Sequence, residues 1–217
     1  MKAILFDVYG TLISTGNGSV TAAGEILRKN GCGIDPAAFY AEWKKLHKTH
    51  MREKSFVPER EIFLADLRAL YTQYSIRGNA AEDVQIMLRS LYDRRAFPET
   101  AAVIQELRGK YELIIASNTD TEPMLKNFAV NGLHFDRVFT SEDLRCYKPE
   151  AAFYEKILKE TGYTAEEVVF VGDSAEEDIL SPKRLGMRTV LIDRKGTGAD
   201  CGQTYTFSDL TGLLSVL

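Results

Sequence analysis

The sequence lacks the features that mark membrane-spanning and secreted proteins. Its apolar runs are only several residues long, whereas roughly 20 consecutive apolar residues are needed to cross a bilayer. The first ten residues contain a short apolar run, but Asp7 interrupts it and no small-residue cleavage site follows. These observations favour a buried first strand over a signal peptide, and they predict no contact with a membrane.

Cysteine is also scarce. Cys32, Cys146 and Cys201 are odd in number, far apart in the sequence and not arranged as a CxxC pair. This pattern favours reduced thiols in a cytoplasmic protein, and it makes a zinc site an unattractive hypothesis.

Clusters of lysine and arginine are absent as well, and the formal net charge is -4. A nucleic-acid backbone is therefore not expected as a partner. With 217 residues, of which 45% are hydrophobic and 27% charged, the chain can fold as one globular domain or as one domain with a smaller insert. A monomer and a homodimer are equally compatible with this composition.

The second half of the sequence alternates between short β-rich runs and segments with helical periodicity. Alternation of this kind predicts crossover connections and a mainly parallel sheet. In such sheets, ligands bind beyond the carboxyl ends of the strands. The expected strands are 2–6, 113–116, 137–139, 168–171 and 189–192, and the clearest helices among them are 100–107 and 152–158.

Residues from about 14 to 95 have a different pattern. Helix-like stretches follow one another there, separated by glycine or proline and uninterrupted by any strand pattern. We interpret this region as an all-helical insert. The expected helices are 20–29, 36–51, 58–74 and 80–94. His47 and His50 fall on one of them and are expected to be solvated rather than bound to a metal.

Polar residues stand at expected strand ends or helix starts in four places. Each occurrence alone is an ordinary turn or helix cap, but their order along one parallel sheet predicts a shared site. The four groups are Asp7 to Thr11, Ser117-Asn118, Lys148-Pro149, and Gly172-Asp173 followed by Asp178.

This order resembles the four-motif signature of the haloacid dehalogenase (HAD) superfamily. The resemblance covers residues 1–13 and about 96–195, including segments 138–143 and 147–154. It implies an α/β fold with a doubly wound, mainly parallel sheet, formed by 1–13 and 96–217. The helical stretch 14–95 would be the cap domain inserted into this core.

The resemblance also implies roles for the residues. Asp7 would be the nucleophile that forms a covalent aspartyl intermediate, which water then hydrolyses. Thr11 and Ser117 would donate hydroxyl hydrogen bonds to an anionic small-molecule substrate, and Lys148 would neutralise charge on both the nucleophile and the substrate.

A magnesium ion is the implied cofactor. Asp7, the carbonyl oxygen of Tyr9 and Asp173 would hold it, with Asp178 in support. Hard oxygen ligands of this kind suit Mg²⁺, which usually takes one or two carboxylates and keeps several waters.

The first and fourth motifs resemble different branches of the superfamily. HAD phosphatases carry a second Asp, the general acid and base, where this chain has Tyr9, and the string from Asp7 to Thr11 instead resembles the 2-haloacid dehalogenase branch. The fourth motif, however, has Asp173 and Ala175, which is the form of the Mg²⁺-dependent phosphatases.

Tyr9 and three further residues fit the dehalogenase branch as substrate-binding groups. Tyr154 follows Lys148 by six positions, and Asn118 follows Ser117 as it does in dehalogenases and phosphatases alike. Lys44, directly after Trp43, stands where the dehalogenase cap supplies an arginine, although lysine lacks the planar guanidinium fork.

Three hypotheses follow for the activity. The first is Mg²⁺-dependent hydrolysis of a small phosphate monoester, because metal stabilisation at a phosphoryl group survives the loss of the acid. The second is metal-independent hydrolysis of a 2-haloacid, and the third is a weakly active member that binds a phosphorylated ligand. A related, phosphonate-cleaving branch uses a cap lysine, for which Lys44, Lys45, Lys48 and Lys54 qualify by residue type alone.

Overall fold

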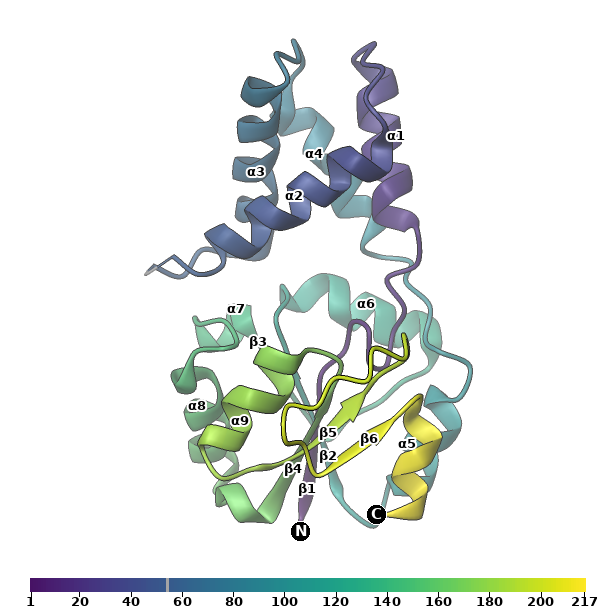
Figure 1. The fold of residues 1–217 in the computed structure, drawn as a ribbon, viewed down its shortest axis with the longest axis vertical. Helices are drawn as coiled ribbons and strands as arrows, with labels where there is room; N and C mark the ends of the chain where they lie inside the picture. Colours follow the sequence, from purple (N-terminus) through teal and green to yellow (C-terminus); the bar gives the residue numbers. More distant parts are fainter. Residues whose placement is uncertain (54) are drawn as a thin grey trace. The chain divides into compact units, whose positions relative to one another are not determined.

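The computed structural model describes residues 1–53 and 55–217, and these form two compact units. We call the first the α/β unit; it contains the chain's two ends (Figure 1). We call the second the helical unit. The α/β unit comprises Met1–Ser14, Arg95–Asn118 and Phe128–Leu217, and the helical unit comprises Thr15–Arg94 and Thr119–Asn127. The domain boundaries expected from the sequence stay a prediction.

A parallel sheet forms the centre of the α/β unit. Within the described residues its strands follow the order β3-β2-β1-β4-β5-β6, and each neighbouring pair is parallel. The strands are β1 (Ala3–Phe6), β2 (Glu112–Ser117), β3 (Arg137–Thr140), β4 (Val168–Gly172), β5 (Arg188–Ile192) and β6 (Tyr205–Phe207).

The register of β1 explains how distant residues meet. Phe6, its last residue, pairs with Ile115 of β2 on one side and with Val171 of β4 on the other. The residues that follow these three strands therefore emerge side by side at one edge of the sheet, where parallel strands present their carboxyl ends.

Helices cover both faces of this sheet. Ala3 and Leu5 of β1 belong to one buried cluster with Phe153 and Ile157 of α8. Figure 1 shows α8 and α9 on one side of the sheet and α5 on the other, where α5 packs against the C-terminal η3. Strands buried on both faces read as continuous apolar runs, as β1 and β4 do. The doubly wound α/β fold expected from the sequence is confirmed.

The helices that connect and flank these strands are mostly short. They are α5 (Thr100–Leu107), α6 (Thr121–Asn131), α7 (Ser141–Leu144), α8 (Ala151–Thr161), η1 (Ala165–Glu167), the π-helical η2 (Ala175–Leu180), α9 (Ser181–Arg184) and η3 (Leu210–Ser215). The sequence pattern did not predict β6, because this strand is three residues long and has two exposed residues. Among the described residues, no helix is long and apolar enough to cross a membrane.

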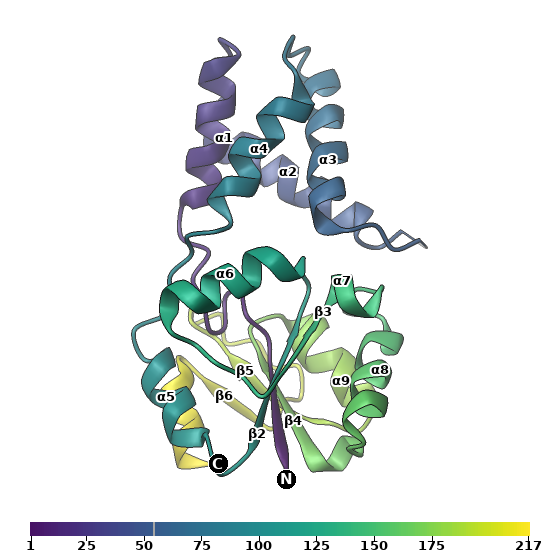
Figure 2. The ribbon, with the colours of Figure 1, turned by 180° about the vertical axis from the view of Figure 1, so that it is seen from behind.

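The helical unit packs around aromatic side chains. It contains α1 (Gly18–Lys29), α2 (Pro36–His50), α3 (Glu59–Gln73) and α4 (Ala80–Ser90), seen from behind in Figure 2, and residues 121–127 of α6. Each of the helices α1 to α4 contacts two of the others: α1 packs on α2 and α4, and α3 does the same. The ring of Trp43 is fully buried, and its centroid lies 6.0 Å from the ring centroids of both Phe39 and Phe63.

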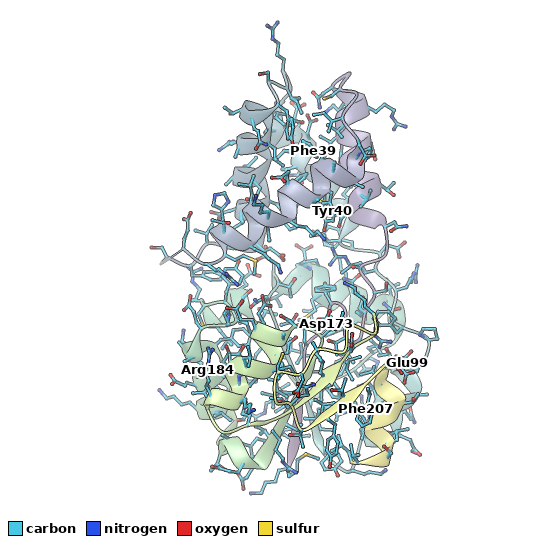
Figure 3. All side chains as sticks on the ribbon, in the orientation of Figure 1. Phe39, Tyr40, Glu99, Asp173, Arg184 and Phe207 are labelled. Carbon is cyan, nitrogen blue, oxygen red and sulfur yellow. The ribbon has the colours of Figure 1, made fainter. Side chains whose placement is uncertain are left out.

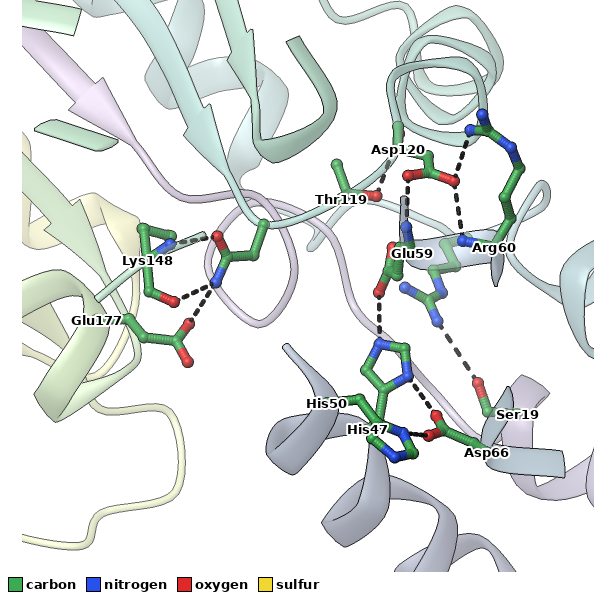
Figure 4. A network of polar contacts seen from close by, with 12 residues as sticks. Ser19, His47, His50, Glu59, Arg60, Asp66, Thr119, Asp120, Lys148 and Glu177 are labelled. Atoms are coloured by element: carbon green, nitrogen blue, oxygen red, sulfur yellow. Dashed lines mark hydrogen bonds and ion pairs between the residues drawn. The ribbon is translucent and has the colours of Figure 1, made fainter. Parts of the chain in front are cut away.

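Residues far apart in the sequence also secure the start of α3. The Asp120 carboxylate accepts hydrogen bonds from the backbone N–H groups of Glu59 at 2.8 Å and Arg60 at 3.0 Å (Figure 4). The first N–H groups of a helix have no partner within the helix, so a carboxylate at this position satisfies them and also interacts favourably with the helix dipole.

An ion cluster joins α2 to α3 inside the helical unit (Figure 4). The buried Asp66 carboxylate accepts from Nδ1 of His47 at 2.7 Å and from Nδ1 of His50 at 2.5 Å. Nε2 of His47 lies 3.3 Å from Glu59. The expectation that these histidines are solvated is therefore wrong for His47, whose side chain is only 12% exposed. A helical pattern shows which residues share a face, but it does not show which carboxylate that face meets.

The charge state of His47 makes the stability of the helical unit depend on pH. Burial by itself lowers the pKa of His47, but the hydrogen bonds to Asp66 and Glu59 outweigh it and raise the pKa to about 9. Because the folded pKa lies above the ordinary value, the stabilisation is fully present below about pH 6.5 and is lost as the pH rises through 9.

We expect His47→Gln to lower the free energy of unfolding by roughly 3 kcal/mol at pH 6, and by much less at pH 10. Urea unfolding at a series of pH values measures this difference. His134→Gln, which changes an exposed histidine of the α/β unit, is the matched control and should follow the wild type throughout. A constant gap between His47→Gln and the wild type from pH 6 to pH 10 would contradict the assignment.

Candidate active site

Asp7 follows the central strand β1 directly and is the hub of a buried polar cluster. Its carboxylate is largely buried and therefore needs hydrogen-bond partners. Oδ1 of Asp7 accepts from Nζ of Lys148 at 2.9 Å and from Oγ of Ser117 at 3.2 Å, and Oδ2 lies 3.4 Å from Oγ1 of Thr11. The structure thus brings together the four residues to which the sequence assigned catalytic roles.

Lys148 lies between two carboxylates. Its ammonium nitrogen is 2.9 Å from Asp7 and 2.7 Å from Asp178, and its side chain is almost completely buried. Burial alone lowers the pKa of Lys148, but the negative charges of Asp178 and Asp7 outweigh burial and raise the pKa well above its ordinary value. Lys148 is therefore charged throughout the physiological range.

The predicted metal ligands of the first and fourth motifs also meet. Carboxylate oxygens of Asp7, Asp173 and Asp178 all lie within 4.8 Å of one another. Loss of hydration, together with the negative charge of Asp7, raises the pKa of Asp173 to about 6. A set of crowded carboxylate oxygens fits a hard divalent cation, because the cation would relieve their mutual repulsion. These residues could hold Mg²⁺.

Two glycines make this crowding sterically possible. Gly10 has a φ of +99°, and a Cβ atom there would overlap the Asp173 carboxylate. A Cβ atom at Gly172 would overlap the Asp178 side chain in the same way. Glycine is thus required at both positions so that the backbone can approach the aspartates.

Asp178 also organises the start of the fourth motif. Its Oδ1 accepts from Lys148, and its Oδ2 accepts from the backbone N–H of Ser174 at 2.9 Å. Both carboxylate oxygens are therefore engaged within the α/β unit. This is the geometry of a residue that orients its neighbours, and the supporting role of Asp178 at a metal site stays a prediction.

Asn118 is bound to the backbone of Lys148. Its Oδ1 accepts from the Lys148 backbone N–H at 2.8 Å, and its Nδ2 donates to the Lys148 carbonyl oxygen at 2.9 Å (Figure 4). Nδ2 also lies 3.4 Å from Oε2 of Glu177. The Ser-Asn dipeptide contains no signal for this pairing, because the two residues are 30 positions apart. Substrate binding by Asn118 stays a prediction, whereas its hold on Lys148 is a structural fact.

Tyr154 lies inside the α/β unit on α8. Its side chain is fully buried, its ring centroid is 5.7 Å from that of Phe170, and its hydroxyl donates to the backbone carbonyl of Glu177. Burial raises the pKa of Tyr154 above its usual range, so the phenol remains neutral. A direct contact with substrate stays a prediction for this residue.

Tyr9, Lys44 and Lys54 are also singled out from the sequence. Tyr9 lies in the turn after Asp7, which is closed by a hydrogen bond from the N–H of Leu12 to the carbonyl of Val8. Lys44 is exposed on α2 of the helical unit, with its ammonium 5.5 Å from the ring centroid of Tyr40. Figure 3 labels Tyr40 in the helical unit and Asp173 in the α/β unit. Lys54 lies outside the described residues.

Known proteins resemble this chain in sequence and in fold. A family model described as haloacid dehalogenase-like hydrolase matches residues 1–186. Among solved structures, the candidate HAD-hydrolase YfnB from Bacillus subtilis, bound to magnesium, superposes with a TM-score of 0.86 at 21% identity, covering 100% of this chain and 98% of that one.

Curated relatives include both a phosphatase and a dehalogenase. A glyceraldehyde 3-phosphate phosphatase from Methanothermobacter thermautotrophicus is 33% identical over 109 residues, which cover 49% of this chain and 48% of that protein. The match thus spans about half the length of that relative. (S)-2-haloacid dehalogenase 4A from Burkholderia cepacia is 24% identical over 97% of this chain and 89% of its own length.

The buried position of Lys148 predicts a large effect on stability. We expect Lys148→Met to lower the free energy of unfolding by about 3–5 kcal/mol at pH 7, because it leaves two buried carboxylates without their cation. Urea unfolding at pH 7 measures the loss. Lys159→Met, which changes an exposed lysine on α8, should unfold like the wild type, and equal behaviour of the two variants would refute the prediction.

Proposed function

The chain belongs to the haloacid dehalogenase-like hydrolase family, and from that premise we propose that it hydrolyses a small phosphate monoester, with Mg²⁺ as cofactor and Asp7 as nucleophile. The observation that carries the proposal is the convergence of Asp7, Asp173 and Asp178, with carboxylate oxygens within 4.8 Å of one another. The curated glyceraldehyde 3-phosphate phosphatase supports the choice of a phosphate ester, and the magnesium in the YfnB structure supports the choice of metal.

The proposed reaction has two steps. In the first, a carboxylate oxygen of Asp7 forms a bond to phosphorus while the ester oxygen leaves with its electron pair, which gives an acyl phosphate. In the second, water attacks the phosphorus and the Asp7 carboxylate is released with inorganic phosphate. Hydroxyl hydrogen bonds from Thr11 and Ser117 would orient the phosphoryl group, and Lys148 would offset its negative charge.

Asp7, Asp173 and the carbonyl oxygen of Tyr9 would hold the Mg²⁺, and Asp178 would support them through Ser174 and Lys148. A bound Mg²⁺ supplies charge neutralisation at the phosphoryl oxygens, worth several kcal/mol of transition-state stabilisation. The same charge would allow Asp7 and Asp173 to be ionised together.

Tyr9 sets a limit on the leaving group. It occupies the position of the general acid and base, and a phenol is a much weaker acid than a carboxylic acid. The leaving oxygen would then depart without strong protonation by the protein. We therefore propose a preference for esters whose leaving group is a stable anion.

A second candidate function is the hydrolysis of a 2-haloacid. Tyr9 favours it, because displacement of halide from carbon needs no acid, and the relation to the (S)-2-haloacid dehalogenase extends over 97% of this chain. In this reaction Asp7 would attack the carbon that bears the halogen, with Lys44, Asn118 and Tyr154 as substrate-binding residues. Asp173 argues against this candidate, because a cation held at Asp7 would compete with the attack on carbon.

Asp7→Asn removes the nucleophile under either candidate function, so it should reduce turnover to background while circular dichroism shows an intact fold. The substrates to test are p-nitrophenyl phosphate and 2-chloropropionate, each with Mg²⁺ and with a chelator. We expect phosphate release that needs Mg²⁺. Halide release that is indifferent to chelator would replace the first candidate function with the second. An active Asp7→Asn variant would refute the assignment of Asp7 as the nucleophile.

Tyr9→Asp should supply the missing acid. We expect kcat/KM for an alkyl phosphate to rise by up to roughly 10²-fold, within the range that general acid–base catalysis contributes. The gain should be smaller for p-nitrophenyl phosphate, whose leaving group needs no proton. Tyr9→Phe is the control, because it changes the side chain without adding an acid. Equal gains for the two esters would show that the effect does not arise from protonation of the leaving group.

A further inference from the structure

Arg194 has no place in the four motifs, yet its guanidinium reaches the loop that carries the nucleophile. It lies two residues after β5, at the carboxyl edge of the sheet. Nε donates to the carbonyl oxygen of Gly10 at 3.2 Å, and Nη2 donates to that of Thr11 at 2.8 Å. These three residues all belong to the α/β unit.

The two carbonyl groups belong to residues that shape the site. The Thr11 hydroxyl lies 3.4 Å from Oδ2 of Asp7, and the Asp173 carboxylate occupies the space next to Gly10 that a side chain would otherwise fill. The Arg194 guanidinium therefore fixes the backbone of two residues. One is Thr11, which contacts the nucleophile, and the other is Gly10, which lies against the predicted metal ligand Asp173.

Arg194 also holds a second segment of the chain. Its Nη2 donates to Oε1 of Glu99 at 2.6 Å, and its Cζ lies 3.5 Å from the ring centroid of Phe97. The backbone N–H of Phe97 in turn donates to the carbonyl of Leu12 at 3.1 Å. Figure 3 labels Glu99 near α5 in the α/β unit. The guanidinium thus fastens the segment around residues 97–99 to the loop formed by residues 7–12.

Arginine suits these contacts better than lysine does. A guanidinium group has several donors in one plane and can also lie against an aromatic ring, whereas a lysine ammonium is a single point charge. The side chain is only 17% exposed, as is that of Glu99, so the ion pair is screened less than a surface pair.

We propose that Arg194 is a positioning residue for Asp7: it fixes the loop of residues 7–12 so that the nucleophile and Thr11 keep the orientation that the reaction needs. The proposal rests on the proposed function for its catalytic consequence. Its structural part does not depend on which substrate is hydrolysed.

The test compares Arg194→Ala, Arg194→Lys and the control Arg188→Ala, which changes an exposed arginine at the opposite end of β5. We expect Arg194→Ala to lower kcat by about 10- to 100-fold with a KM change below about threefold, because misplacement of a nucleophile impairs chemistry more than binding. Arg194→Lys should recover little of this loss, and added guanidinium chloride at millimolar concentration should restore part of it in Arg194→Ala only.

A second readout does not require activity. Hydrogen exchange of residues 8–13 should become faster in Arg194→Ala and stay at the wild-type rate in Arg188→Ala. Wild-type kcat with unchanged exchange would overturn the proposal, and so would a loss confined to KM. If Arg194→Ala does not fold, Arg194→Lys is measured in the same way and decides the question. If the wild type hydrolyses neither phosphate nor haloacid, the proposed function fails, and the exchange rates still show whether Arg194 fixes the loop.

Discussion

A buried ammonium group between two buried carboxylates is the constraint on which the candidate site depends. Lys148 contacts both Asp7 and Asp178, so neither aspartate is left as an uncompensated charge in the interior. The Asn118 side-chain amide fixes the backbone of Lys148, because it accepts a hydrogen bond from the Lys148 N–H group and donates one to the Lys148 carbonyl oxygen. The lysine that balances the charges is thereby fixed in place next to the largely buried Asp7. A carboxylate must be ionised to act as a nucleophile.

The parallel sheet explains why such a cluster can be assembled from separate segments. Asp7, Ser117 and Asp173 all come at or just after the carboxyl ends of β1, β2 and β4, which are neighbours in the sheet. The pairing of Phe6 with Ile115 and Val171 places these ends at the same level. The segments themselves contribute only one or two polar side chains each, and the shared edge turns them into a site.

The helical unit has an electrostatic centre of its own. Asp66 binds two histidines of α2, and Asp120 satisfies the first N–H groups of α3. These contacts tie α3 to α2 and to a residue just beyond the second motif. They give the unit a defined internal packing beyond what its apolar residues provide, and they make its stability sensitive to the protonation of His47.

The sequence alone determined the fold class, the order of the motifs and the identity of the residues at the strand ends, because hydrophobic periodicity and motif spacing are local properties of the chain. Only the tertiary structure decided how those residues are supported. The amide of Asn118 meets Lys148 across 30 positions, Arg194 meets Gly10 across 184, and His47 meets Asp66 on another helix. Such contacts depend on which surfaces face each other after folding, and side-chain hydrogen bonds between remote residues leave no periodic trace in the sequence.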